Sequence, residues 1–87
     1  MPWKIGYGKR VAKSLAKLPL NDHRRIVEAM AAMQEDPLRG DVQVPRNQPA
    51  SFRRRVGSYR ILFDLDLTTR TVLIHDVLRR STTTYRR

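Results

Sequence analysis

The sequence contains no cysteine in its 87 residues. That absence excludes a disulfide framework, a thiolate nucleophile and a sulfur-ligated metal, and it agrees with a reducing compartment. The chain also lacks an apolar run long enough to cross a bilayer, and its first ten residues, MPWKIGYGKR, lack the apolar stretch of a secretory signal. The sequence therefore predicts a cytoplasmic protein with no membrane partner.

Acidic residues are scarce, because eight Asp and Glu stand against 18 Lys and Arg and leave a formal charge of +10. Such an excess predicts a polyanionic partner. All nine basic residues between positions 51 and 87 are arginines. The planar arginine fork suits phosphate oxygens better than the point charge of lysine, so this bias favours phosphate contact. A solvated basic surface is the alternative interpretation of the same composition.

The length of the chain limits its organisation. With 40% apolar residues, 87 residues can bury one core and leave no room for a second domain. The sequence has no internal repeat and no low-complexity tract. We therefore predict a single domain over residues 1–87 that ends in a basic tail, residues 79–87.

The first half of the chain predicts one strand and two helices. Trp3, Ile5 and Tyr7 alternate with small or polar residues, which is typical of a short strand with one apolar face. Residues 9–18 and 21–36 carry apolar residues at helical spacing, and Asn21 or Asp22 is the expected cap of the second helix. The short connection predicts an antiparallel helical hairpin. Residues 37–50, with three prolines and a glycine, predict a loop.

After residue 50 the apolar period changes to two. Residues 51–56, 59–67 and 71–77 are expected strands, and Gly57-Ser58 is a two-residue hairpin turn. The whole order predicts an α+β fold: an N-terminal strand, a helical hairpin and a three-stranded antiparallel β-meander, with the helices packed on one face of a small sheet.

The hairpin register sorts its side chains between two faces. Around Gly57-Ser58 it pairs Arg55 with Arg60, and it directs these apolar residues to the core: Phe52, Val56, Tyr59, Ile61, Phe63 and Leu65. Arg53, Arg55 and Arg60 take the opposite face. Like charges directly opposite each other repel by roughly 1 to 3 kcal/mol, which favours an anion site there. Arginine heads that splay into solvent are the alternative.

The roles of five other polar residues in the strands are harder to assign. The register puts His75 on the arginine side, where it is a reserve acid or base, although a lone strand histidine is more often structural. Arg54 falls on the core side, and Asp76 is its expected partner near the sheet end. Asp64 and Asp66 have no third ligand beside them, so solvated strand-end charges are favoured over a metal site.

The segment FRRRVGSYRILFDLD, residues 52–66, closely resembles the signature hairpin of the RelE/ParE superfamily of bacterial toxins. The resemblance covers nearly the whole chain, since it includes the KRVAKSLAKL helix, the DPLRGD segment and the final IHDVLRR strand with its Tyr-Arg tail. It implies the RelE-like microbial RNase fold, no metal or other cofactor, and a cognate antitoxin as partner. Promoter DNA is implied only as a partner of the toxin-antitoxin complex.

Two activities divide this superfamily: RelE-like members cleave mRNA in the ribosomal A site, and ParE-like members poison DNA gyrase. Residue by residue, the resemblance implies catalytic roles for Arg60, Arg80 and Tyr85. It implies RNA-binding roles for Arg53 and Arg55, and the charges of Arg79, Arg86 and Arg87 are expected to add to RNA binding. All are suitable residue types, which favours a metal-independent endoribonuclease that acts with the ribosome on mRNA and inhibits translation. A ParE-like gyrase poison and a non-toxic nucleic-acid-binding module are the alternatives.

The implied residues fit the chemistry of RNA cleavage. The ribose 2′-hydroxyl attacks the adjacent phosphate while negative charge builds on the phosphoryl oxygens, and arginines aimed at that charge stabilise the transition state. Tyr85 is the expected base, because surrounding cations favour its phenolate. Some RelE-like enzymes have lysines where Arg53 and Arg55 stand. Arginine does not give up its proton, which weakens any acid or base role at these two positions.

Overall fold

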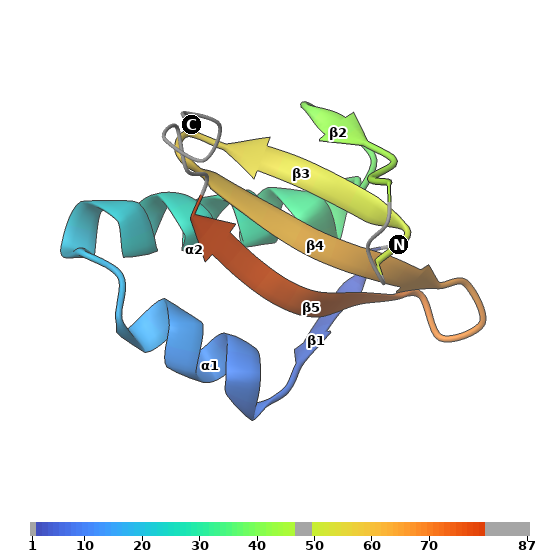
Figure 1. Cartoon of the computed structure of the whole chain (residues 1–87). Coiled ribbons are helices and arrows are strands. Elements are labelled where there is room, and N and C mark those ends of the chain that lie inside the picture. The colour runs from blue at the N-terminus through green and yellow to red at the C-terminus, as the bar shows by residue number, and fades with distance from the viewer. Residues whose placement is uncertain (1, 47–49, 80–87) are drawn as a thin grey trace.

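The computed structural model describes residues 2–46 and 50–79 (Figure 1). Its elements are β1 (Lys4–Tyr7), α1 (Lys9–Ala16), α2 (Leu20–Glu35), β2 (Val42–Gln43), β3 (Phe52–Val56), β4 (Tyr59–Asp66) and β5 (Thr71–Arg79). The strands form one five-stranded sheet in the order β1-β5-β4-β3-β2. Strand β1 runs parallel to β5 and the other neighbours are antiparallel, so the predicted α+β class is confirmed.

Both helices cover the same face of the sheet (Figure 1). The core between the helices and the sheet is made of Val11 and Leu15 from α1, four residues of α2, and three residues each of β4 and β5. Its most completely buried large side chains are Phe63, Ile26, Met33, Ile61, Val11 and Val72. Because successive strand residues point to opposite faces, the other face of the sheet is left open for function.

The start of α2 differs from the prediction. The helix begins at Leu20, with Pro19 at the N-cap position and no side-chain cap, so neither Asn21 nor Asp22 caps it. The fixed backbone angle of proline suits the entry to a helix and shifts the start towards Pro19. Asp22 instead lies in the first turn and accepts a hydrogen bond of 3.0 Å from the Tyr59 hydroxyl, which ties α2 to β4.

This tie predicts that Tyr59→Phe destabilises the fold. Burial, followed by the bond to Asp22, raises the pKa of Tyr59, so the neutral hydroxyl is the form that the folded state favours. Its removal leaves the half-buried Asp22 carboxylate without this donor, which lowers the free energy of unfolding. Urea unfolding at pH 7 measures the loss. Because the pKa is raised, the stabilisation is complete below the unfolded value of about 10 and is lost at higher pH. Equal midpoints at pH 7 would contradict the prediction.

The predicted hairpin register is confirmed. Strands β3 and β4 pair Phe52 with Phe63 and Arg55 with Arg60, and Gly57 adopts the positive φ of 58° that the tight turn requires. The rings of Phe52 and Phe63 stack with centroids 5.4 Å apart. All six apolar residues assigned to the helix-facing side of this hairpin are buried or pack against the core.

The edges of the sheet depart from the prediction. The expected loop contains the two-residue strand β2, which pairs with β3 and extends the sheet. At the opposite edge, Ile5 and Trp3 pack against the core, but Tyr7 is 51% exposed, so the predicted apolar face of β1 is wrong at its last residue. The short edge strands leave β5, β4 and β3 as the inner strands, and β4 and β5 supply half of the buried core residues.

A β-bulge in β5 changes the predicted register near its end. Phe63 pairs with Ile74 as expected, but Leu62 pairs with Asp76, so His75 is an extra residue with no cross-strand partner. The predicted position of Asp76 beside Ile61 is therefore wrong. Asp76 lies 3.6 Å from the Nε of Arg10 and forms an ion pair with α1. Bulges redirect side chains, and this one redirects His75.

Candidate nucleic-acid interface

Three arginines lie on the sheet surface that the helices leave uncovered. Arg53, Arg55 and Arg60, which we call the arginine face, alternate with core residues along β3 and β4. Arg55 and Arg60 stand directly opposite each other in the register, as the sequence predicts. The structure therefore brings together the three predicted phosphate-binding residues of these strands on one surface.

Strand β2 and the residue before it orient two of these arginines. Arg53 donates through Nη2 to the side-chain oxygen of Gln43, and the Nε of Arg55 lies 3.5 Å from a carboxylate oxygen of Asp41. This ion pair, which the sequence argument did not include, partly offsets the repulsion across the hairpin. Alternation in the segment Asp41-Val42-Gln43-Val44 was the available signal for this strand, and the neighbouring prolines concealed it.

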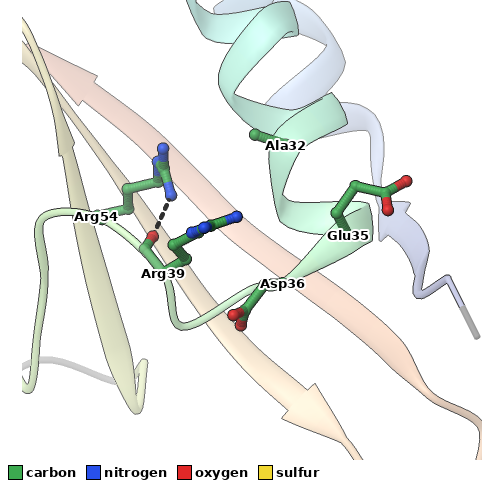
Figure 2. Close-up of a pocket in the computed structure, with 6 residues that line it drawn as sticks. Ala32, Glu35, Asp36, Arg39 and Arg54 are labelled. Carbon is green, nitrogen blue, oxygen red and sulfur yellow. Dashed lines mark hydrogen bonds between the residues drawn. The ribbon is translucent and has the colours of Figure 1, made fainter.

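Arg54 anchors the chain that leads to β2. The predicted contact between Arg54 and Asp76 is absent. The bulge moves Asp76 opposite Leu62, and Asp76 pairs with Arg10 instead. Nη1 of Arg54 donates a hydrogen bond of 2.6 Å to the backbone carbonyl of Arg39, and Figure 2 shows its guanidinium pointing to the segment after α2. The arginine that interrupts the core pattern thus fixes the segment that carries Asp41.

A pocket of about 350 Å³ lies at this anchor, between the end of α2 and β3. Gly40 closes it with a positive φ of 94°, and a Cβ atom there would come within 3.1 Å of Arg54 Nη1. The positive φ favours glycine, and a Cβ atom there would also crowd the Arg54 guanidinium. The pocket is lined by Ala32, Glu35, Asp36, Arg39, Gly40 and Arg54 (Figure 2).

Asp64 and His75 form a second polar group on the open side of the sheet. Asp64 accepts a 2.7 Å hydrogen bond from the backbone N–H of Ser51, and its other oxygen lies 2.5 Å from Nε2 of His75. Hydrogen bonding from Ser51, reinforced by His75 against the opposing effect of desolvation, lowers the pKa of Asp64. The prediction of a solvated strand-end charge at Asp64 is therefore wrong.

The lowered pKa predicts how Asp64→Asn changes stability with pH. A carboxyl group whose folded pKa is depressed stabilises the protein above its unfolded pKa of about 3.9, and the stabilisation is lost as the pH falls through the folded value. We expect Asp64→Asn to unfold at lower urea concentration at pH 7, with a difference that shrinks below about pH 4. Parallel urea titrations from pH 7 to pH 3 measure it. A difference that is the same at every pH would contradict the assignment.

One further predicted site residue, Arg79, lies away from the arginine face. Arg79 ends β5 opposite Tyr59, so alternation places it on the helix side rather than on the arginine face. The tail residues Arg80, Tyr85, Arg86 and Arg87 lie outside the described residues. Within residues 2–46 and 50–79, no cluster of three or more His, Asp or Glu side chains could hold a metal ion. No helix in these ranges is long and apolar enough to span a membrane.

Comparison with known proteins gives structural relatives only. No protein-family model and no curated protein sequence matches the chain. Among solved structures, a chain of the RelBE2 toxin-antitoxin complex of Mycobacterium tuberculosis is 30% identical, with a TM-score of 0.78 over 92% of this chain and 100% of that chain. A chain of the archaeal RelE-RelB complex of Pyrococcus horikoshii is 23% identical, with a TM-score of 0.80 over 94% and 99%.

The isolated RelE toxin of E. coli is 15% identical, with a TM-score of 0.76 over 91% of this chain and 85% of that one. The two more distant structures show the fold, two helices on one face of a small mixed sheet. The 30% identical mycobacterial chain places this protein in the class of small toxins from toxin-antitoxin modules. At 30% identity over its full length, the mycobacterial relative shows the family, and the chain belongs to the RelE family of these toxins.

Proposed function

We propose that this protein is a ribosome-dependent mRNA endonuclease that inhibits translation. One observation carries the proposal: Arg53, Arg55 and Arg60 share the open face of one hairpin. Contacts with residues 41–43 orient two of these arginines. Guanidinium groups held in place before the substrate arrives stabilise charge on a phosphate without reorganising. The arrangement fits an RNA backbone laid across β3 and β4.

In the proposed reaction the ribose 2′-oxygen attacks the adjacent phosphorus and the bond to the 5′-oxygen breaks. Arg60, together with Arg80, holds the scissile phosphate and stabilises the charge that develops on its oxygens. Arg53 and Arg55 hold the flanking backbone, which fixes the geometry of attack. Tyr85 accepts the 2′-hydroxyl proton. Arg79, Arg86 and Arg87 add charge for RNA binding.

Two macromolecular partners follow from this proposal. The ribosome supplies the mRNA in the geometry that attack requires, since the arginine face provides cations for the RNA backbone. A cognate antitoxin is the second partner. The mycobacterial and archaeal relatives were solved as toxin-antitoxin complexes, and an antitoxin that covers the arginine face would neutralise its charge.

Inducible expression of the chain tests the proposal against gyrase poisoning. We expect new mRNA 5′ ends at codon-phased positions within translated regions, absent from the same messages when their start codons are removed. DNA supercoiling in the same cells should stay unchanged. Gyrase-linked DNA breaks without mRNA cuts would instead assign a ParE-like activity, and the absence of both effects would leave a non-toxic nucleic-acid-binding module.

A further inference from the structure

The proposed reaction needs two proton transfers, and the arginine face can supply neither. One proton leaves the 2′-hydroxyl, and another must reach the 5′-oxygen as its bond to phosphorus breaks. A guanidinium group keeps its proton at any physiological pH, so Arg53, Arg55 and Arg60 act as fixed charges. If Tyr85 takes the first proton, a separate group has to donate the second.

His75 is placed to donate it. The bulge in β5 frees His75 from cross-strand pairing and turns it to Asp64, whose carboxylate lies 2.5 Å from Nε2. The lowered pKa of Asp64 keeps that carboxylate ionised at neutral pH, so it accepts from Nε2–H and fixes the ring. Among the residues that the structure describes, the His75 side chain makes no other hydrogen bond, and it is 42% exposed. Nδ1 is therefore available to a substrate.

The histidine also lies within reach of the proposed phosphate. Asp64, which holds the ring, is four residues from Arg60 on the same strand and face, or about 13 Å between Cα atoms at about 3.3 Å per residue. Leu62 lies midway between Arg60 and Asp64 on the same face and is buried. Arg53 pairs with Leu62 from the other side. A phosphate over Leu62 can thus meet guanidinium groups and an imidazole together.

We propose that His75 is the general acid of the reaction and that Asp64 is its positioning residue. The inference rests on the proposed endonuclease activity. In the step, the 2′-oxygen forms a bond to phosphorus and gives a 2′,3′-cyclic phosphate, and its proton passes to the Tyr85 phenolate. The bond between phosphorus and the 5′-oxygen breaks, and the imidazolium delivers its Nδ1 proton to that oxygen. Histidine suits this task because its charge changes near neutral pH.

Replacement of the leaving oxygen by sulfur tests the assignment. An mRNA with a bridging 5′-sulfur at the cut site leaves as a thiolate, and thiols ionise near pH 8.5, so its departure needs no proton donor. In single-turnover cleavage of a programmed ribosome complex, we expect His75→Ala to cut the oxygen substrate at least ~100-fold more slowly than wild type. It should cut the sulfur substrate within about threefold of the wild-type rate, whereas loss of a general base slows both substrates by the usual ~100-fold scale.

Asp64→Asn separates positioning from packing. The carbonyl oxygen of asparagine can still accept from Ser51 N–H. Its NH2 group then faces His75 and cannot accept the Nε2 proton, so the protonated ring loses the hydrogen bond that orients it. We expect Asp64→Asn to cleave the oxygen substrate roughly 10-fold more slowly than wild type. It should cleave the sulfur substrate at the wild-type rate. In wild type, the descending alkaline limb of the pH-rate profile should appear with oxygen and be absent with sulfur. The charged groups on this face of the sheet are Arg53, Arg55, Arg60, Asp64 and Asp66, with Asp76 next to His75 in β5.

The controls separate failure of this inference from failure of the proposed function. His23→Ala removes the other histidine, on α2, and should leave both rates unchanged. If His75→Ala melts early, His75→Gln preserves a side chain that bonds to Asp64 but donates no acidic proton. An intact rate on oxygen, or an equal loss on both substrates, overturns the role of His75 while wild-type cleavage stands. A wild-type protein that cuts neither substrate overturns the endonuclease proposal and this inference with it.

Discussion

Arg60→Ala is expected to abolish toxicity and to slow mRNA cleavage by about 10²- to 10³-fold, the scale for loss of one donor to a developing oxyanion. Arg60 extends from β4, an inner strand whose alternate residues Tyr59 and Ile61 are buried, so its backbone is held firmly. Its position opposite Arg55 places two cations at one point of the hairpin. Single-turnover cleavage at saturating toxin measures the loss, and growth after induction measures toxicity.

The fold of this variant should remain intact. Loss of Arg60 removes a like charge opposite Arg55, so the free energy of unfolding should stay equal or rise by less than about 1 kcal/mol. Arg24→Ala is the matched control, because it removes one exposed arginine from α2 and leaves the open face unchanged. A toxic Arg60→Ala protein, or one that is non-toxic because its thermal melt is lost, would refute the assignment.

Much of the fold could be predicted from the alternation of apolar residues, and the exceptions have local causes. The β3-β4 register follows from Gly57-Ser58 and from the parity of Phe52 and Phe63, since a slip of one residue would turn the arginines into the core. Strand β2 is only two residues long, and the prolines near it concealed the short alternation of polar and apolar residues around it. The parallel pairing of β1 with β5 is non-local, and no feature of residues 4–7 specifies it.

The positions of the three arginines on the open face could be predicted from the sequence, whereas the contact between Asp64 and His75 could not. Alternation along the strands predicts which face the three arginines take, because the prediction depends only on the register of one hairpin. The contact between Asp64 and His75 depends on a bulge, which one extra residue in β5 creates without any glycine or proline to mark it. Asp64 also needs Ser51, 13 residues away, to complete its hydrogen bonds. Such contacts arise from packing, not from local pattern.

Tyr85→Phe is expected to lower the cleavage rate by at least ~100-fold, the usual scale for loss of a general base, with little change in ribosome affinity. Only the hydroxyl is removed, because phenylalanine preserves the ring that can stack on a base and leaves the arginines of the sheet unchanged. The measurement is single-turnover cleavage of a programmed ribosome complex at saturating toxin. A purely binding role for Tyr85 predicts a rate close to that of wild type.

The deletion of Arg86 and Arg87 provides the contrast that gives the tyrosine result its meaning. Cations that contact the phosphate backbone act through the release of condensed counterions, so the truncated chain should bind more weakly and with a shallower dependence on salt concentration. At saturating toxin its cleavage rate should be close to wild type, the reverse of the Tyr85→Phe result. If Tyr85→Phe cuts at the wild-type rate, Tyr85 is not the base, and the sulfur-substituted mRNA then decides whether His75, fixed by Asp64, accepts the 2′-hydroxyl proton instead of donating one.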